Sequence, residues 1–265
     1  MQIEIFNTSS PGASFTDNTN SVLLKIFEWI KEHPGLNISF KEFRVRLEND
    51  KEVNDNNNRN IFPLLKNGRL VQYEKGGEIL VDKFYTKTGL AYVKTLELLN
   101  LIKQDSKYTK DQVIASENKL NEILQNIIYG ALLNIVNTND LNYVEPFQDM
   151  IQFLLKFQKI SKEEYAYLLF ERQRSDIFTS LNAIADNIHK YRANEINIET
   201  SVTVRNDIEI QQRTSSKNRQ EGLSFLTSYG YFVSLLSQAG LIAKQDKYYT
   251  MVGNKRDLLK KLVGE

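Results

Sequence analysis

The sequence carries one short pattern twice, once near each end of the chain. Residues 64–70 and residues 235–242 each run from a pair of leucines through a glycine to further apolar residues. Glycine permits the left-handed backbone angle that ends many helices, and the leucines before it can bury against neighbouring helices. Each copy therefore predicts a helix that ends and passes directly into a strand.

A second pattern follows each copy in the same order. Residues 85–89 and residues 249–253 both have Tyr-Thr at the start and Gly at the end, and each precedes a helix that ends in leucines. The threonine can cap that helix. Two elements in the same order at both ends indicate an internal structural repeat. The alternative is a pair of ordinary helix-to-strand joints in an unrelated helical protein.

The first copy lies in a recognisable series of elements. Apolar residues recur at helical spacing from Ser21 to a stop at 33–35, and Ser39 with Glu42 forms a capping box for a second helix. A third helix is expected to start among residues 56–58 and to stop at 67–68. Two strands, 69–73 and 78–82, then enclose a glycine turn and predict a hairpin. Three helices followed by a hairpin is the order of a winged helix-turn-helix, and a helix over 88–103 closes this unit.

The middle of the chain has a helical pattern throughout. Apolar spacing predicts helices at 111–137, 146–158, 161–171 and 175–193, the third with a capping box of Ser161 and Glu164. Residues 196–210 then alternate between apolar and polar, which predicts one strand or a pair of strands. The expected fold is mainly α with small β wings, as two winged helix-turn-helix units flanking a helical bundle. The segments are an N-terminal strand and arm (1–20), winged unit 1 (21–105), the bundle (106–195), and a strand with winged unit 2 (196–265).

This arrangement points to double-stranded DNA as the partner, because the third helix of a helix-turn-helix enters the major groove with its N-terminal residues on base edges. Asparagine pairs well with adenine and arginine with guanine. Lysines and arginines on the wings are candidates for phosphate contact. In the first unit the candidate DNA-binding residues are Asn56, Asn57, Asn58, Arg59, Asn60, Arg69 and Lys75. In the second they are Arg213, Ser215, Ser216, Lys217, Asn218, Arg219, Thr227, Ser228, Tyr229, Lys244 and Lys247.

Composition narrows the other possibilities. The chain has 265 residues, no cysteine and only two histidines, so disulfides and cysteine zinc sites are excluded. No run of about 18 apolar residues exists, and the first residues lack a signal-peptide pattern, so we expect a cytoplasmic protein without a membrane partner. The net charge of +1 means that DNA binding must depend on local basic patches.

No catalytic residues are predicted. Only residues 105–107 and 117–119 have the Asp/Glu-x-Lys pattern of a magnesium-dependent nuclease, which is no more than chance supplies in so charged a chain. Phosphate-binding glycine loops and nucleophile–base pairs are also absent. We expect no metal and no cofactor in this chain.

One stretch resembles a known family. Tyr143-Val-Glu-Pro-Phe147, continuing through residues 151–155 and 160–169, is similar to the recognition region of type IIS restriction endonucleases of the AlwI and nicking-endonuclease group. The resemblance covers about 85–265, although residues 196–210 have no counterpart in it. It implies a bacterial restriction-modification protein in which a helical bundle and winged subdomains recognise DNA. The nuclease domain or subunit, with its Mg²⁺, would lie outside this chain.

Three alternatives remain open at this point. A plasmid replication initiator with tandem winged helices would bind directly repeated sites, and a transcriptional regulator would bind a palindrome as a symmetric dimer. A protein-interaction scaffold would ignore DNA.

Overall fold

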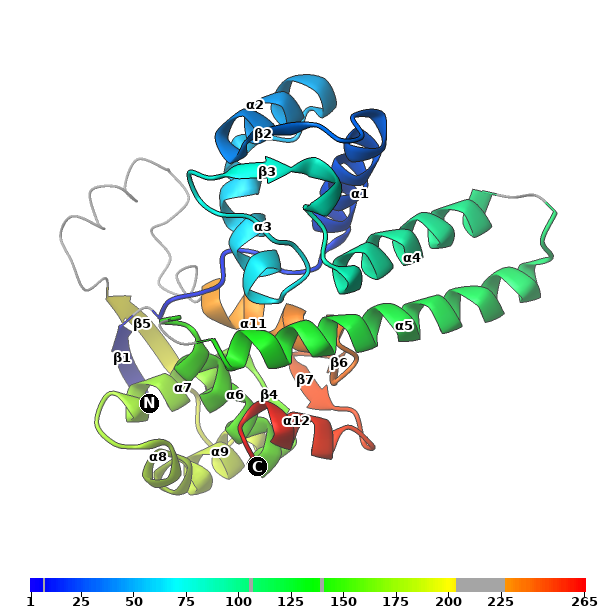
Figure 1. Ribbon diagram of the computed structural model, residues 1–265. Helices are drawn as coiled ribbons and strands as arrows, with labels where there is room; N and C mark the ends of the chain where they lie inside the picture. Colours follow the sequence, from blue (N-terminus) through cyan, green and yellow to red (C-terminus); the bar gives the residue numbers. More distant parts are fainter. Residues whose placement is uncertain (7, 105–106, 139–140, 204–226) are drawn as a thin grey trace. The chain divides into compact units, whose positions relative to one another are not determined.

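The computed structural model describes residues 1–6, 8–104, 107–138, 141–203 and 227–265, and in these the fold is mainly helical with small sheets (Figure 1). Contacts sort the chain into two compact units. The N-terminal unit is 11–139 with 238–240, and the C-terminal unit is 1–10, 140–237 and 241–265. The four segments expected from the sequence remain a prediction about domains.

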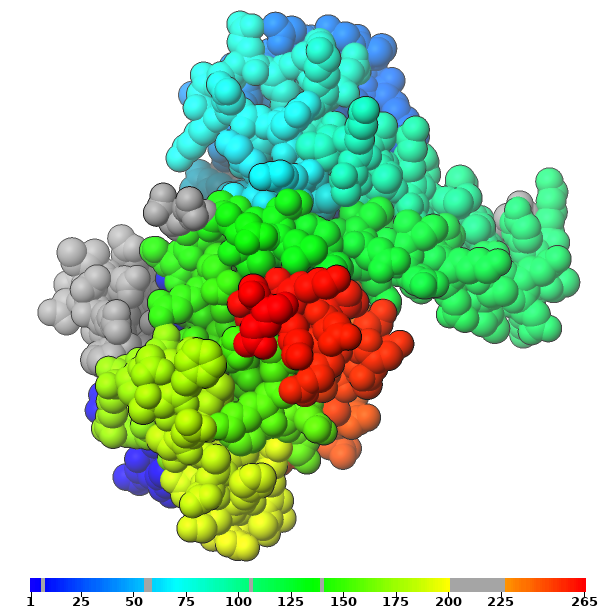
Figure 2. Space-filling view, turned by 60° about the horizontal axis from the view of Figure 1, so that its bottom comes forward, coloured from blue at the N-terminus to red at the C-terminus, as the bar shows by residue number. Residues whose placement is uncertain are grey.

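The N-terminal unit begins with three helices, as the sequence predicted. Side-chain caps define their starts: Thr16 accepts from the amide of Thr19, and Ser39 from that of Glu42. Two further helices, α4 and α5, pack side by side, and their far ends extend beyond the rest of this unit (Figures 1 and 2). The elements are α1 (Asp17–Glu32), β2 (Asn37–Ser39), α2 (Phe40–Lys51), α3 (Asp55–Asn67), β3 (Glu78–Leu80), the 3₁₀ turn η1 (Val81–Lys83), α4 (Lys87–Gln104) and α5 (Lys110–Val136).

The strand pairing in this unit corrects the predicted hairpin. β3 pairs antiparallel with β2, the strand between α1 and α2, and not with residues 69–73. Val71 instead forms a bridge with Tyr85, beyond η1. A three-residue strand such as β2 is too short to show a period of two in the sequence, so the pairing partner was missed. Pairing of the strand before the second helix with the strand after the wing is the arrangement of a winged helix.

Aromatic rings fill the core of the N-terminal unit. Phe43, Phe62 and Phe84 are buried, and the rings of Phe43 and Phe62 both lie against that of Phe84, with centroids 5.0 Å and 5.6 Å from it. Trp29 is fully buried, and its indole N–H donates to Asp50 at 2.7 Å. These contacts hold α1, α2 and α3 against the segment that follows β3.

The C-terminal unit contains the remaining elements. The helix expected at 175–193 is two helices, α8 and α9. Its elements are β1 (Gln2–Phe6), α6 (Val144–Phe157), β4 (Lys159–Ile160), α7 (Lys162–Arg172), α8 (Ile177–Ala183), α9 (Ala185–Arg192), β5 (Glu199–Thr203), α11 (Thr227–Gln238), β6 (Ile242–Gln245), β7 (Tyr248–Met251) and α12 (Arg256–Leu262).

Two small sheets organise this unit. β6 and β7 form the antiparallel hairpin expected for the second wing, and β4 joins it on the other edge of β7, in the order β4-β7-β6. β4 lies between the helices expected at 146–158 and 161–171, where the sequence analysis predicted no strand. The predicted strand at 196–210 is present as β5, which pairs in parallel with β1; residues 204–210 lie outside the described residues.

The two units repeat one topology. In the N-terminal unit a helix, a strand and two helices (α1, β2, α2, α3) lead to a wing whose second strand pairs with β2. In the C-terminal unit α6, β4, α7 and α11 stand in the same order, and the second wing strand, β7, pairs with β4. α8, α9 and β5 come between α7 and α11 along the chain. The winged units are thus confirmed, but α6 and α7 belong to the second one.

Hydrogen bonds show which residues correspond in the repeat. The amide of Leu70 donates to Leu65 at 2.8 Å, and that of Leu241 donates to Leu236 at 2.9 Å. The left-handed residue before each is Arg69 (φ 56°) and Gly240 (φ 68°), so Gly240 matches Arg69. The predicted match to Gly68 is off by one residue.

The second repeated pattern is displaced as well. The amide of Thr86 donates to Leu70, and the amide that donates to Leu241 is that of Val252, not Thr250; both distances are 3.0 Å. Thr86 caps α4 as expected, since its hydroxyl accepts from Gly89. Thr250 caps nothing, because α12 starts later, at Arg256.

In the described residues, no helix has both the length and the apolar character that crossing a membrane requires.

Candidate nucleic-acid interface

The outer face of α2 and α3 is the first candidate surface. Both helices bury one apolar side, with Phe43 and Leu47 on α2 and Leu64 and Leu65 on α3. The solvent-facing sides of these helices carry charges of both signs, on the elements that enter DNA in a helix-turn-helix. On α2, Lys41, Arg44 and Arg46 are interspersed with Glu42 and Glu48, and Arg46 is paired with Glu42. On α3, Arg59 and Lys66 are exposed.

Tyr73 lies between this face and the wing. Its ring stacks on Phe40 with centroids 4.1 Å apart and an interplanar angle of 8°, and the Lys66 ammonium lies 4.9 Å from the Tyr73 centroid. Burial raises the pKa of the Tyr73 phenol, and the positive charge of Arg44 acts in the opposite direction. The phenol therefore stays neutral and can donate a hydrogen bond beside two cations, an arrangement suited to a phosphate or a base.

The predicted contact residues of the N-terminal unit are distributed over this surface. Asn56, Asn57 and Asn58 lie in the first turn of α3, and their side chains are outside the described part of the chain. Arg59 and Asn60 follow them and are exposed. The sequence did not single out Tyr73, Lys66, Lys41 or Arg44. The helical spacing of Lys66 from the buried leucines was the signal that could have identified it as outward-facing.

Arg69 and Lys75 are both exposed, at the two ends of the segment 69–75 that follows α3. Arg69 carries the positive φ angle that ends the helix, and its carbonyl accepts from Thr86. Lys75 lies in the turn of the wing, next to Gly76 at φ +89°. A lysine at a wing tip is in a suitable place for a phosphate contact.

Helix α11 occupies the corresponding third-helix position in the C-terminal unit. Thr227, its first residue, is exposed, as expected for a contact residue. Ser228 and Tyr229 were wrongly included, because both side chains are buried. The Ser228 hydroxyl bonds to Thr8 and Tyr165, and the Tyr229 hydroxyl donates to the carbonyl of Ile160 at 3.4 Å.

The outward side of α11 is formed by residues three, four and seven positions after Thr227. Gly230 is exposed, and Tyr231 and Ser234 are partly exposed. A methyl group at Gly230 would meet nothing within 4 Å, so the fold itself does not require glycine there. The predicted residues Arg213, Ser215, Ser216, Lys217, Asn218 and Arg219 lie outside the described residues.

The two lysines predicted on the second wing have different surroundings. Lys244 is exposed on β6. Lys247, in the turn before β7, places its ammonium 3.2 Å from the hydroxyl of Tyr191 and 4.5 Å from the centroid of that ring. Lys247 is thus engaged by α9 and only partly available to a phosphate, whereas Lys244 presents its charge outward.

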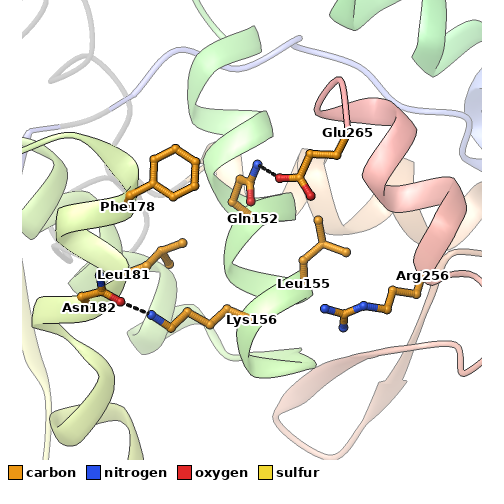
Figure 3. A pocket seen from close by; sticks show the side chains of 8 residues that line it. All are labelled: Gln152, Leu155, Lys156, Phe178, Leu181, Asn182, Arg256 and Glu265. Carbon is orange, nitrogen blue, oxygen red and sulfur yellow. Dashed lines mark hydrogen bonds between the residues drawn. The ribbon is translucent and has the colours of Figure 1, made fainter.

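A pocket of about 230 Å³ lies elsewhere in the C-terminal unit (Figure 3). Leu155 and Leu181 form a buried apolar base. Phe178 lies beside them and is two-thirds exposed. Lys156 donates to Asn182 at 2.5 Å, and Gln152 donates to Glu265 at 2.9 Å. Arg256 also lines the pocket. The lining side chains include no serine, threonine, cysteine or histidine.

In the residues that the structure describes, no three or more His, Cys, Asp or Glu side chains come close enough to form a metal site.

No protein-family model matches the chain, and comparison with curated proteins and with solved structures gives no match either.

Proposed function

We propose that this chain binds double-stranded DNA with sequence specificity through its two winged helix-turn-helix units. We further propose that it is the recognition part or subunit of a restriction endonuclease whose nuclease centre lies outside the chain. The observation that carries DNA binding is the repeated topology. In each unit the strand before the second helix pairs with the last wing strand, and α3 or α11 stands in the place of a recognition helix.

Charge and exposure support the same function. Arg59 and Lys66 project from α3 on the side opposite its buried leucines, and Lys75 is exposed on the wing that follows. Arginine can bond two acceptors of a guanine, while lysine acts as a point charge for phosphate. The net charge of +1 does not oppose this function, because local cations such as Arg59, Lys66 and Lys75 can contact DNA without a positive field of the whole molecule.

The role in restriction rests on the resemblance of 143–169 to type IIS recognition regions. In such a protein the chain would supply the recognition of bases, and a nuclease domain or subunit would supply the carboxylates and Mg²⁺ for cleavage. The protein would work in the cytoplasm.

Selection of bound duplexes from a random library tests the function. Two different recognition helices in one chain should select an asymmetric site in two parts. Directly repeated parts would favour the replication initiator, since that protein also has tandem winged helices. A palindrome would favour the transcriptional regulator. Absence of any enrichment would favour a protein-interaction scaffold and contradict the proposal.

A further inference from the structure

The N-terminal arm of the chain contacts the start of α11 through one hydroxyl group. Thr8 lies just after β1, and its Oγ1 shares a hydrogen bond of 2.7 Å with the Oγ of Ser228. Ser228 is the second residue of α11. A residue 220 positions away in sequence is therefore bonded to the first turn of the candidate recognition helix.

A third hydroxyl completes this contact. The phenol of Tyr165, on α7, lies 3.3 Å from the Ser228 Oγ, and both side chains are fully buried. Burial raises the pKa of the Tyr165 phenol, so it stays neutral at physiological pH. We call Thr8, Tyr165 and Ser228 the hydroxyl triad. It joins the arm, α7 and α11 in one hydrogen-bonded group of the C-terminal unit.

The strand that precedes Thr8, β1, is held in place by pairing and packing. β1 pairs in parallel with β5 over five residues, from Gln2 opposite Glu199 to Phe6 opposite Thr203. Ile3 and Ile5 are buried, and β1 also contacts α7. Thr8 is thus held by a packed strand, and it can act as a fixed point for Ser228.

The triad has a direct consequence for the orientation of α11. Successive residues of a helix are rotated by about 100°, so an inward hydrogen bond at Ser228 fixes which residues point outward. Thr227, Tyr231 and Ser234 share the outer side, and Thr227 is the most exposed of them. A rotation of α11 that moved Ser228 away from Thr8 would also turn these side chains away from a bound groove.

We propose that Thr8 and Tyr165 are positioning residues that set the rotation of α11 through Ser228, and thereby the base preference of the C-terminal unit. The inference rests on the proposed function, since it assigns the arm a part in recognition by α11. Thr8 and Tyr165 carry no charge, and their contribution is therefore to discrimination between sequences and not to general attraction for phosphates.

The test compares Thr8→Val with Thr8→Ser in the full chain. Valine keeps the shape of threonine and loses the hydroxyl, whereas serine keeps the hydroxyl. Thr95→Val is the matched control, because the Thr95 hydroxyl bonds within α4, to the carbonyl of Ala91 at 2.8 Å. Each variant is used in duplex selection, and Arg59→Ala identifies which half of the selected site belongs to the N-terminal unit.

Thr8→Val should lower the base preference in the half of the site bound by the C-terminal unit. We expect a loss of about three- to tenfold, which corresponds to the net free energy of one neutral hydrogen bond. The N-terminal half and the salt dependence should not change, and Thr8→Ser and Thr95→Val should behave like the wild type. Unchanged preference in Thr8→Val would overturn the inference. An equal loss in both halves would overturn it too, because it would show general damage to the fold.

Amide hydrogen exchange over residues 229–238 separates this inference from the proposed function. The same loss of one hydrogen bond should speed exchange there in Thr8→Val and not in Thr8→Ser. If the wild type selects no sequence, the proposed function fails, and the role of the triad in recognition fails with it. Exchange unchanged in Thr8→Val would show that the triad does not hold α11, even if DNA binding is specific.

Discussion

A methyl group built on Gly89 would lie 1.8 Å from the carbonyl oxygen of Leu70. The first turn of α4 therefore passes so close to the segment after α3 that no side chain fits. The same carbonyl accepts from the amide of Thr86. This contact fixes α4 against the base of the first wing, and it makes Gly89 a test of the packing.

We expect Gly89→Ala to destabilise the N-terminal unit by about 2 to 4 kcal/mol, since the obstructing atom is backbone and cannot move aside. Gly253→Ala is the matched control. It has open space around it and no positive φ angle, and its effect should stay within about 0.5 kcal/mol. Urea unfolding of the two variants measures the difference, and equal stability would contradict this packing.

A buried ion pair gives a prediction that depends on pH. Asp149 accepts from Arg172 at 2.7 Å; burial raises the pKa of Asp149, and the bond and charge of Arg172 lower it in part. Arg172→Met removes that compensation and should cost about 3 to 5 kcal/mol at pH 7. The pKa of Asp149 then rises further above its unfolded value. Protonation restores stability at low pH, and stability is lost as pH rises through the folded pKa.

Urea unfolding at pH 4.5 and pH 7 tests this pair. The free energy of unfolding of Arg172→Met should be closer to that of the wild type at pH 4.5 than at pH 7. The double variant with Asp149→Asn should recover stability at pH 7. A loss of stability in Arg172→Met that is the same at both pH values would show that the charge of Asp149 is not its cause.

Arg59 and Lys75 should have different effects on DNA binding. Arg59→Ala should cost about 1 to 3 kcal/mol and relax the base preference at one position, because arginine bonds to base edges. Lys75→Ala should weaken binding to all sequences alike and make the salt dependence of the affinity less steep. Titration of a selected and a random duplex at two salt concentrations distinguishes them. An equal loss for every sequence in Arg59→Ala would exclude its role in base recognition.

Gly230 gives a prediction with opposite signs for folding and for binding. Alanine is a better helix former than glycine by about 0.5 to 1 kcal/mol, and no neighbour obstructs it here. Gly230→Ala should therefore stabilise the free protein and weaken its binding to DNA, if the backbone of α11 approaches the duplex closely. The melting temperature and the dissociation constant of the same preparation check both. Unchanged DNA affinity would show that α11 is not approached at this residue.

Much of the fold could be predicted from the sequence, because capping residues and apolar spacing identify helices. Ser39, Ser161 and the leucines before Gly240 marked helices that the structure contains. The capping box is complete at Ser161, whereas at Ser39 only the serine half forms and Glu42 accepts from Arg46. Short strands were harder. β2 and β4 have three and two residues, too few for an alternation, and their partners lie far along the chain.

Single glycines also misled the sequence interpretation. Gly68 was expected to supply the left-handed angle that ends α3, but Arg69 adopts it. Gly68 instead lies at a tight helix contact, since a methyl group there would lie 3.0 Å from the Cβ of Ala131 on α5. A pattern within one segment cannot reveal a contact made by another helix.

The candidate contact residues remain a prediction, and the structure shows only where they lie. Arg59 was proposed because it lies near the start of an amphipathic helix, and its side chain is exposed. Ser228 was assigned to the DNA side although it points inward, because its partners, Thr8 and Tyr165, are distant in sequence. Tyr73 was not singled out, since its stacking on Phe40 depends on the folded wing.

Selection of duplexes from a random library by the wild-type chain, with binding measured at two salt concentrations, tests the central claim most directly. Two winged units with different recognition helices predict a short asymmetric consensus in two parts, whose preference over random duplex persists at the higher salt. Absence of enrichment, or binding that disappears for all sequences alike as salt rises, would contradict sequence-specific recognition of DNA by this chain.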